Sequence, residues 1–172
     1  MGIKETYNYD NEPFAALRDS ARGVVAAYQD AARFLDTTQE NVYINMGMKH
    51  LAHKIHLLAH EMPKRFDDFG DMLHERHLMV EYPATSELVE KIETPDEAFT
   101  VVISVLDNVQ DALERFREAT DNAVFRPMAL KAEELMTQNS RDYTKFMEMA
   151  AMWENGGISA ASFDNWVLHL ED

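Results

Sequence analysis

Six of the seven histidines in this sequence fall between residues 50 and 77, interspersed with acidic residues. On an ideal helix, which turns about 100° per residue, seven side chains of this stretch lie within an arc of roughly 100°. We call them the polar row: His53, His56, His60, Asp67, Asp71, His74 and Glu75. Imidazoles and carboxylates one turn apart bind divalent transition metals such as iron, zinc or manganese. The polar row is therefore a candidate metal site, and the alternative is the solvated face of an acidic protein.

Within the polar row, Asp71 and Glu75 give the sharpest signal, because they form a carboxylate pair four residues apart with His74 between them. The candidate metal ligands are His53, His56, His60, Asp67, Asp71 and Glu75. The apolar side chains of the same stretch centre on nearly the opposite face of the helix; they are Leu51, Ile55, Met62, Phe66, Phe69 and Leu73. We therefore expect the polar row to point away from the protein's own core.

Several known metal arrangements do not fit the spacing. A di-iron site inside one four-helix bundle needs Glu-x-x-His on two helices, and this sequence contains no Glu-x-x-His. The zinc protease pattern His-Glu-x-x-His is also absent, because Lys64 occupies the position of the second histidine after His60-Glu61. No histidine occurs before residue 50 or between residues 78 and 168, which excludes a site built from histidines of several helices. We expect a site shared between subunits rather than one enclosed in a single bundle.

Apolar residues recur at intervals of three and four, and strand patterns are nearly absent, which predicts an all-helical protein. The expected helices cover residues 12–36, 37 to about 80, 86–92, 95–121 and 127–155. Four long helices predict an all-α four-helix bundle with a short helix in the connection between the second and third helices. The chain is expected to form one domain, residues 1–172. Its apolar tail, residues 156–172, should pack on the same chain or on a neighbour.

Local signals set these boundaries. Potential capping boxes of the form Thr-x-x-Glu at residues 37–40 and 94–97 predict the starts of the second and third long helices. Pro63 lacks a backbone donor, so the second helix should kink or break near Met62. The pair Gly156-Gly157 should end the fourth long helix.

The composition restricts the partners. Among 172 residues, 31 acidic and 16 basic side chains give a formal charge of −15, which disfavours nucleic acid and anionic membranes and favours cations. The absence of cysteine excludes disulfides, thiolate metal sites and thiol chemistry. No apolar run is long enough to span a membrane, and the first residues lack the pattern of a signal peptide. We therefore expect a cytoplasmic protein.

The segment Asp71-Met-Leu-His-Glu-Arg76 resembles the Asp-x-x-Ala-Glu-Arg motif in the second helix of the Dps family, the ferritin-like mini-shells of starved bacteria. Only His74 departs from that motif. Residues 82–85, Tyr-Pro-Ala-Thr, resemble the family's Gly-Gly-x-Pro-x-Gly-Thr turn without its glycines, and residues 140–153 are similar to its fourth helix. The resemblance covers roughly residues 12–155 and implies a ferritin-like bundle.

In that family two subunits build each iron site: one lends histidines from its first two helices, and its neighbour lends the Asp and Glu of the motif. The resemblance assigns these carboxylate positions, and with them the catalytic role, to Asp71 and Glu75. It places His56 at the second-helix histidine and His60 where the family has an aspartate. Residues 12–36 contain no histidine, so the first-helix ligand has no counterpart. The candidates to replace it are His50, His53 and Asp67. The alternative is that ferroxidation has been lost.

The resemblance implies a protein that binds Fe²⁺, about two ions per site, oxidises it with peroxide or oxygen and stores the Fe³⁺ product. Storage implies a hollow homo-oligomer, expected to contain about twelve subunits built from dimers. Protection against oxidative stress would be indirect, because direct DNA binding is not expected: Lys4 is the only basic residue among residues 1–13. The alternative, from a different class, is a helical bundle without ferroxidase activity that serves as a binding or assembly protein.

Overall fold

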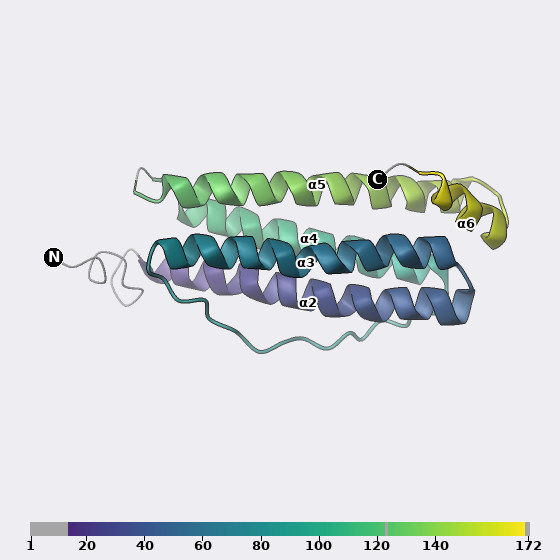
Figure 1. Cartoon of the computed structure of the whole chain (residues 1–172), viewed down its shortest axis with the longest axis horizontal. Helices are drawn as coiled ribbons and strands as arrows, with labels where there is room; N and C mark the ends of the chain where they lie inside the picture. The colour runs from purple at the N-terminus through teal and green to yellow at the C-terminus, as the bar shows by residue number, and fades with distance from the viewer. Residues whose placement is uncertain (1–13, 123, 171–172) are drawn as a thin grey trace.

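Four long helices and one short helix make up the computed structural model, which describes residues 14–122 and 124–170 (Figure 1). The helices are α2 (Phe14–Met46), α3 (Lys49–Glu75), α4 (Pro95–Ala119), α5 (Arg126–Asn155) and α6 (Ala160–Leu168). None of the described residues forms a strand. The predicted helix start at residue 12 and the N-terminal segment with Lys4 lie outside the described residues.

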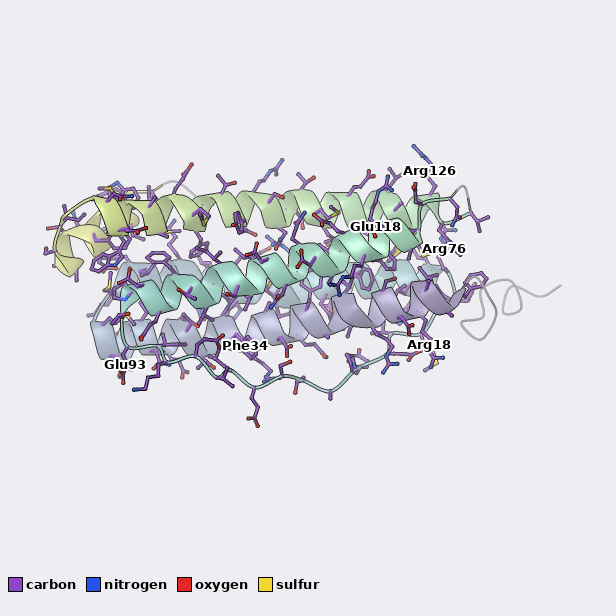
Figure 2. All side chains as sticks on the ribbon, turned by 180° about the vertical axis from the view of Figure 1, so that it is seen from behind. Arg18, Phe34, Arg76, Glu93, Glu118 and Arg126 are labelled. Carbon is purple, nitrogen blue, oxygen red and sulfur yellow. The ribbon has the colours of Figure 1, made fainter. Side chains whose placement is uncertain are left out.

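The four long helices pack against one another in a defined arrangement. Helix α2 packs against α3 and α4, and α4 packs against α5. Helices α3 and α4 run in the same direction, so residues 76–94, which connect them, travel the length of the bundle beside α2 (Figure 1). Figure 2 shows the same arrangement from behind, with Arg18, Arg76 and Arg126 at one end of the bundle and Glu93 at the other. The predicted all-α four-helix bundle is confirmed.

The predicted boundary at Thr37 is wrong, because α2 continues without interruption to Met46. The Thr37 hydroxyl donates to the carbonyl of Arg33 at 3.1 Å, within the same helix, instead of capping a new one. Thr38 and Val42 are fully buried and continue the apolar stripe of α2, so tertiary packing favours the longer helix. The turn comes at Gly47, whose φ of 66° lies in the left-handed region that glycine adopts most readily.

Helix α3 is continuous through Pro63, so a break near Met62, one of the two predicted outcomes, is wrong, and the other, a kink, stays a prediction. The proline is on the exposed side of the helix, and Met62 and Arg65, on either side of it, are both buried in the bundle. Packing on both sides of the proline therefore holds the helix together although one backbone hydrogen bond is lost. The helix ends at Glu75 rather than near residue 80. There His77 adopts a φ of 58°, which is unusual for a residue other than glycine.

The predicted short helix over residues 86–92 is not formed. The backbone of Ser86 instead bonds to side chains of α2: Asp30 accepts from its N–H at 3.0 Å, and Arg33 donates to its carbonyl at 2.5 Å. A helix of seven residues has little stability of its own, so these contacts are enough to hold the segment in another conformation. The short helix of this fold lies after the bundle, in α6.

The predicted boundaries of the last two long helices are close to those observed. Thr94 and Glu97 form the expected capping box at the start of α4, and α5 ends where Gly156 and Gly157 follow it. The apolar tail packs on the same chain: Phe163 of α6 is fully buried against rings that include Trp153. No helix in the described part of the chain combines the length and apolarity that crossing a bilayer requires.

Helix α6 also caps α3. Met48, which precedes α3, offers no side-chain cap. The buried carboxylate of Asp164 takes that role, because it accepts hydrogen bonds from the backbone N–H of His50 at 3.1 Å and of Leu51 at 2.8 Å. These N–H groups belong to the first turn of the helix, where no intrahelical partner is available. The start of the helix that carries the polar row therefore depends on a residue more than one hundred positions away in the sequence.

We predict that Asp164→Ala lowers the free energy of unfolding by about 1–3 kcal/mol, since it leaves buried backbone donors without a partner. Asp164→Asn keeps one acceptor oxygen and should lose less. Urea unfolding followed by circular dichroism measures both, with Asn165→Ala, an exposed position of the same helix, as the matched control. An Asp164→Ala variant as stable as the wild type would contradict this account of the cap.

Candidate metal site

The polar row lies on the exposed face of α3, as predicted. Six of its seven side chains are exposed, and His56 is half-buried; the exposed ones are His53, His60, Asp67, Asp71, His74 and Glu75. The opposite face is buried in the bundle through Leu51, Ile55, Met62, Phe69 and Leu73. The row is therefore accessible to an ion from solvent and to a second protein.

Three of the four imidazoles of the polar row, those of His53, His56 and His60, lie in the N-terminal half of α3. The ring centroids of His56 and His60 lie 4.3 Å apart, and those of His53 and His56 lie 6.4 Å apart with nearly parallel planes. Their neighbour Glu61 is paired with Lys64 at 2.6 Å. The predicted ligands of this half are thus close to one another.

The carboxylates lie in the other half of the helix. Because an α-helix rises about 1.5 Å per residue, Asp71 is about 16 Å along the axis from His60 and about 22 Å from His56. Metal–ligand bonds are only about 2 Å long, so one ion cannot join these residues within one chain. Consistent with this, no group of three or more His, Asp or Glu side chains among the described residues is arranged to hold an ion. The proposed ligand set stays a prediction, and within one chain it falls into two halves.

The centre of the bundle contains an ion pair that the sequence analysis missed. Arg65 of α3 and Asp142 of α5 approach to 2.6 Å between Nη1 and Oδ2, with side chains only 10% and 18% exposed. Tyr28 of α2 is buried beside them, and burial raises the pKa of its hydroxyl above the ordinary value, partly offset by the Arg65 charge. We call these residues, with Asn139 and Gln110, the central polar cluster.

Asn139 and Gln110 extend the central polar cluster to α4. The Asn139 amide donates to the Leu106 carbonyl at 2.9 Å and to the Gln110 side-chain oxygen at 3.1 Å. The hydroxyl of Tyr28 and the side-chain oxygen of Asn139 have no hydrogen-bond partner among the described residues. Each of the four long helices thus contributes a polar side chain near its middle.

The central polar cluster disfavours a metal ion inside the bundle. The Arg65 guanidinium stays charged at any physiological pH and pairs with the Asp142 carboxylate at 2.6 Å, so this carboxylate is not free to bind an ion. The sequence expectation of a site shared between subunits stays a prediction. A signal for Arg65 was present in the sequence: it lies three residues after Met62 and four before Phe69, so a charged residue occupies a position of the apolar stripe.

The arrangement of the helices defines the class of fold: a ferritin-like four-helix bundle followed by a short fifth helix. No protein-family model and no curated protein sequence matches this chain. Solved structures of ferritins do match its fold.

The ferritin of M. penetrans superposes with a TM-score of 0.78 at 12% sequence identity, and the match covers 92% of this chain and 96% of that one. An open-pore ferritin from the hyperthermophilic archaeon Archaeoglobus fulgidus superposes with a TM-score of 0.77 at 15% identity, covering 94% and 100% of the two chains. An engineered closed form of that ferritin gives a TM-score of 0.74 at 14% identity, covering 94% and 99%. At these identities the likeness shows the fold, and the narrower resemblance to Dps stays a prediction.

We predict that Arg65→Ala lowers the free energy of unfolding by about 3–5 kcal/mol, because it leaves the Asp142 carboxylate buried without its partner. The double variant Arg65→Met/Asp142→Leu removes both charges and should recover most of that loss. Lys64→Ala, an exposed neighbour, serves as the control and should change stability by less than about 0.5 kcal/mol. Equal losses in the single and double variants would show that the ion pair does not set the stability of the bundle centre.

Proposed function

We propose that this chain is a subunit of a hollow homo-oligomer that binds Fe²⁺ where two subunits meet, oxidises it and retains the Fe³⁺ product. One observation carries the proposal: a single exposed helix face bears imidazoles at one end and carboxylates at the other, too far apart to share an ion within one chain. Such a face is complementary to a second copy of itself.

In a symmetric dimer, the histidine half of one polar row can lie close to the carboxylate half of the other. If two copies of α3 pack antiparallel about a two-fold axis near residue 65, the histidine half of each copy faces the carboxylate half of the other. His56 and His60 of one subunit would then meet Asp71 and Glu75 of the second. Asp67 of the second subunit lies between such an axis and this site, so it would be the next carboxylate to reach the ion. Each pair of subunits would contain two equivalent sites.

The chemistry of these ligands suits iron as the substrate. Mixed imidazole and carboxylate ligands bind Fe²⁺, and exposed positions leave room for an oxidant on the metal. Two Fe²⁺ ions give up one electron each; a peroxide that takes both electrons and two protons leaves as two water molecules. With oxygen, the same two electrons and two protons yield peroxide. The formal charge of −15 attracts Fe²⁺ to the oligomer.

We predict that Asp71→Ala combined with Glu75→Ala reduces Fe²⁺ oxidation to the rate of protein-free buffer while the helical content stays unchanged. His56→Ala should reduce the rate by about 10-fold or more, whereas the control His77→Ala, beyond the end of α3, should have little effect. Anaerobic Fe²⁺ loading followed by addition of peroxide or oxygen, monitored by the absorbance of Fe³⁺, measures these rates. If the double variant oxidised Fe²⁺ as fast as the wild type, the result would favour the alternative, a bundle that serves in binding or assembly only.

We predict that the protein is a closed homo-oligomer, with about twelve subunits as the expected number, because isologous dimers that assemble further cover the polar row. Light scattering coupled to size exclusion measures the mass at micromolar concentration. A mass of 19.8 kDa, that of a single chain, would contradict the proposal. A larger closed assembly would support the hollow oligomer and correct only the number of subunits.

A further inference from the structure

A groove lies between α3 and α5, where these two helices have few contacts with each other. Helix α6 lies at the end of the bundle where α3 begins and α5 ends, and it contributes Trp166 to the groove (Figure 1). The cavity of the groove has a volume of about 340 Å³, which is within the range of small-molecule sites. Its apolar lining consists of Leu57, Leu58, Phe146, Met149, Trp166 and Leu170.

Part of this apolar lining is accessible to solvent. Leu57 is 41% exposed, and Trp166 and Leu170 are half-buried. A molecule that covers Leu57 and Trp166 removes their apolar surface from water, which favours binding. The groove therefore suits a ligand with an apolar chain or ring.

Two of the three acidic residues that line the groove already have cationic partners. Glu61 pairs with Lys64 at 2.6 Å, and Asp142 pairs with Arg65 at 2.6 Å. These two carboxylates are therefore not available to a cationic ligand. The third acidic residue, Glu148, is exposed and forms no ion pair among the described residues.

Two lysines line the groove from its two walls, Lys54 from α3 and Lys145 from α5. The Nζ of Lys54 donates a hydrogen bond to the carbonyl of Leu170 at 3.3 Å. Lys145 is exposed and forms neither an ion pair nor a hydrogen bond among the described residues. An anion in the groove approaches ammonium groups of both walls, whereas the unpaired Glu148 lies on α5 only. The charges of the lining therefore favour an anionic group on the ligand.

We infer that the groove between α3 and α5 binds a small amphipathic carboxylate, whose apolar chain or ring contacts Leu57 and Trp166 and whose carboxylate pairs with Lys145. On an ideal helix, the α3 side chains that line the groove centre about 100° away from the polar row. The site is thus separate from the candidate iron ligands. The inference does not depend on the proposed function, because neither an iron ligand nor a second subunit takes part.

The test titrates the full chain with octanoate, followed by calorimetry and by tryptophan fluorescence, since Trp166 lines the groove. We expect saturable binding of octanoate and weaker binding of 1-octanol and octylammonium, which have the same chain but no negative charge. Lys145→Gln should weaken octanoate binding by about 2- to 5-fold and leave 1-octanol binding unchanged. Glu148→Gln should strengthen octanoate binding. Arg141→Gln, at an exposed position of the same helix outside the lining, is the matched control and should change neither.

The variant Leu57→Glu tests the apolar wall. It should weaken octanoate binding by about 10-fold or more, because it removes an apolar contact and places a second carboxylate beside that of the ligand. Leu130→Glu is the matched control, because Leu130 is an exposed leucine of α5 outside the groove. Both positions are exposed, so circular dichroism should show an unchanged helical content.

Other outcomes overturn the inference. Absence of saturable octanoate binding, or equal binding by the wild type and Leu57→Glu, would exclude the groove as the site. Binding of octylammonium as tight as that of octanoate, or equal losses in Lys145→Gln and Arg141→Gln, would show that Lys145 does not select a carboxylate. None of these results concerns Fe²⁺ oxidation, so a failure of this inference is distinguishable from a failure of the proposed function.

Discussion

The continuity of α3 is the constraint on which the candidate site depends. Because the helix passes through Pro63 unbroken, its rise fixes the distance between the imidazoles near His56 and the carboxylates near Asp71. Burial of one face of the helix also fixes the direction in which both groups point. A break at the proline would have allowed the two halves to fold toward each other. Because the helix is continuous, the imidazoles and the carboxylates can share an ion only across a contact between subunits.

The interior of the bundle shows that a fold does not by itself determine which chemical groups lie at its centre. The helices superpose on ferritins over nearly the whole chain, yet the bundle centre holds the Arg65–Asp142 ion pair and a buried Tyr28. The Arg65 guanidinium occupies the buried Asp142 carboxylate, and the pair joins α3 to α5 where the two helices have few other contacts. The fold alone therefore does not locate a metal site in this chain, whose candidate ligands lie on the polar row, outside the bundle.

The features that the sequence predicted correctly are those set by neighbouring residues. The capping box at Thr94 and the separation of the polar row from the apolar face follow from local spacing, and both were confirmed. The similar pattern at Thr37 failed because burial of the following turns favoured a continuous helix. The contact of Asp164 with the start of α3 joins residues far apart in the sequence, so no local pattern could reveal it. The sequence indicated one member of the ion pair, because Arg65 interrupts an apolar stripe. It did not indicate the partner, Asp142.

The central claim is that imidazoles of one subunit and carboxylates of another form one iron site. The most direct test co-assembles two inactive variants in equal amounts, His56→Ala/His60→Ala and Asp71→Ala/Glu75→Ala, and measures Fe²⁺ oxidation by the mixed oligomer. In each mixed pair one of the two sites regains both halves, so random pairing should restore about a quarter of the wild-type rate. A mixed oligomer that is as inactive as each variant alone would contradict the shared site.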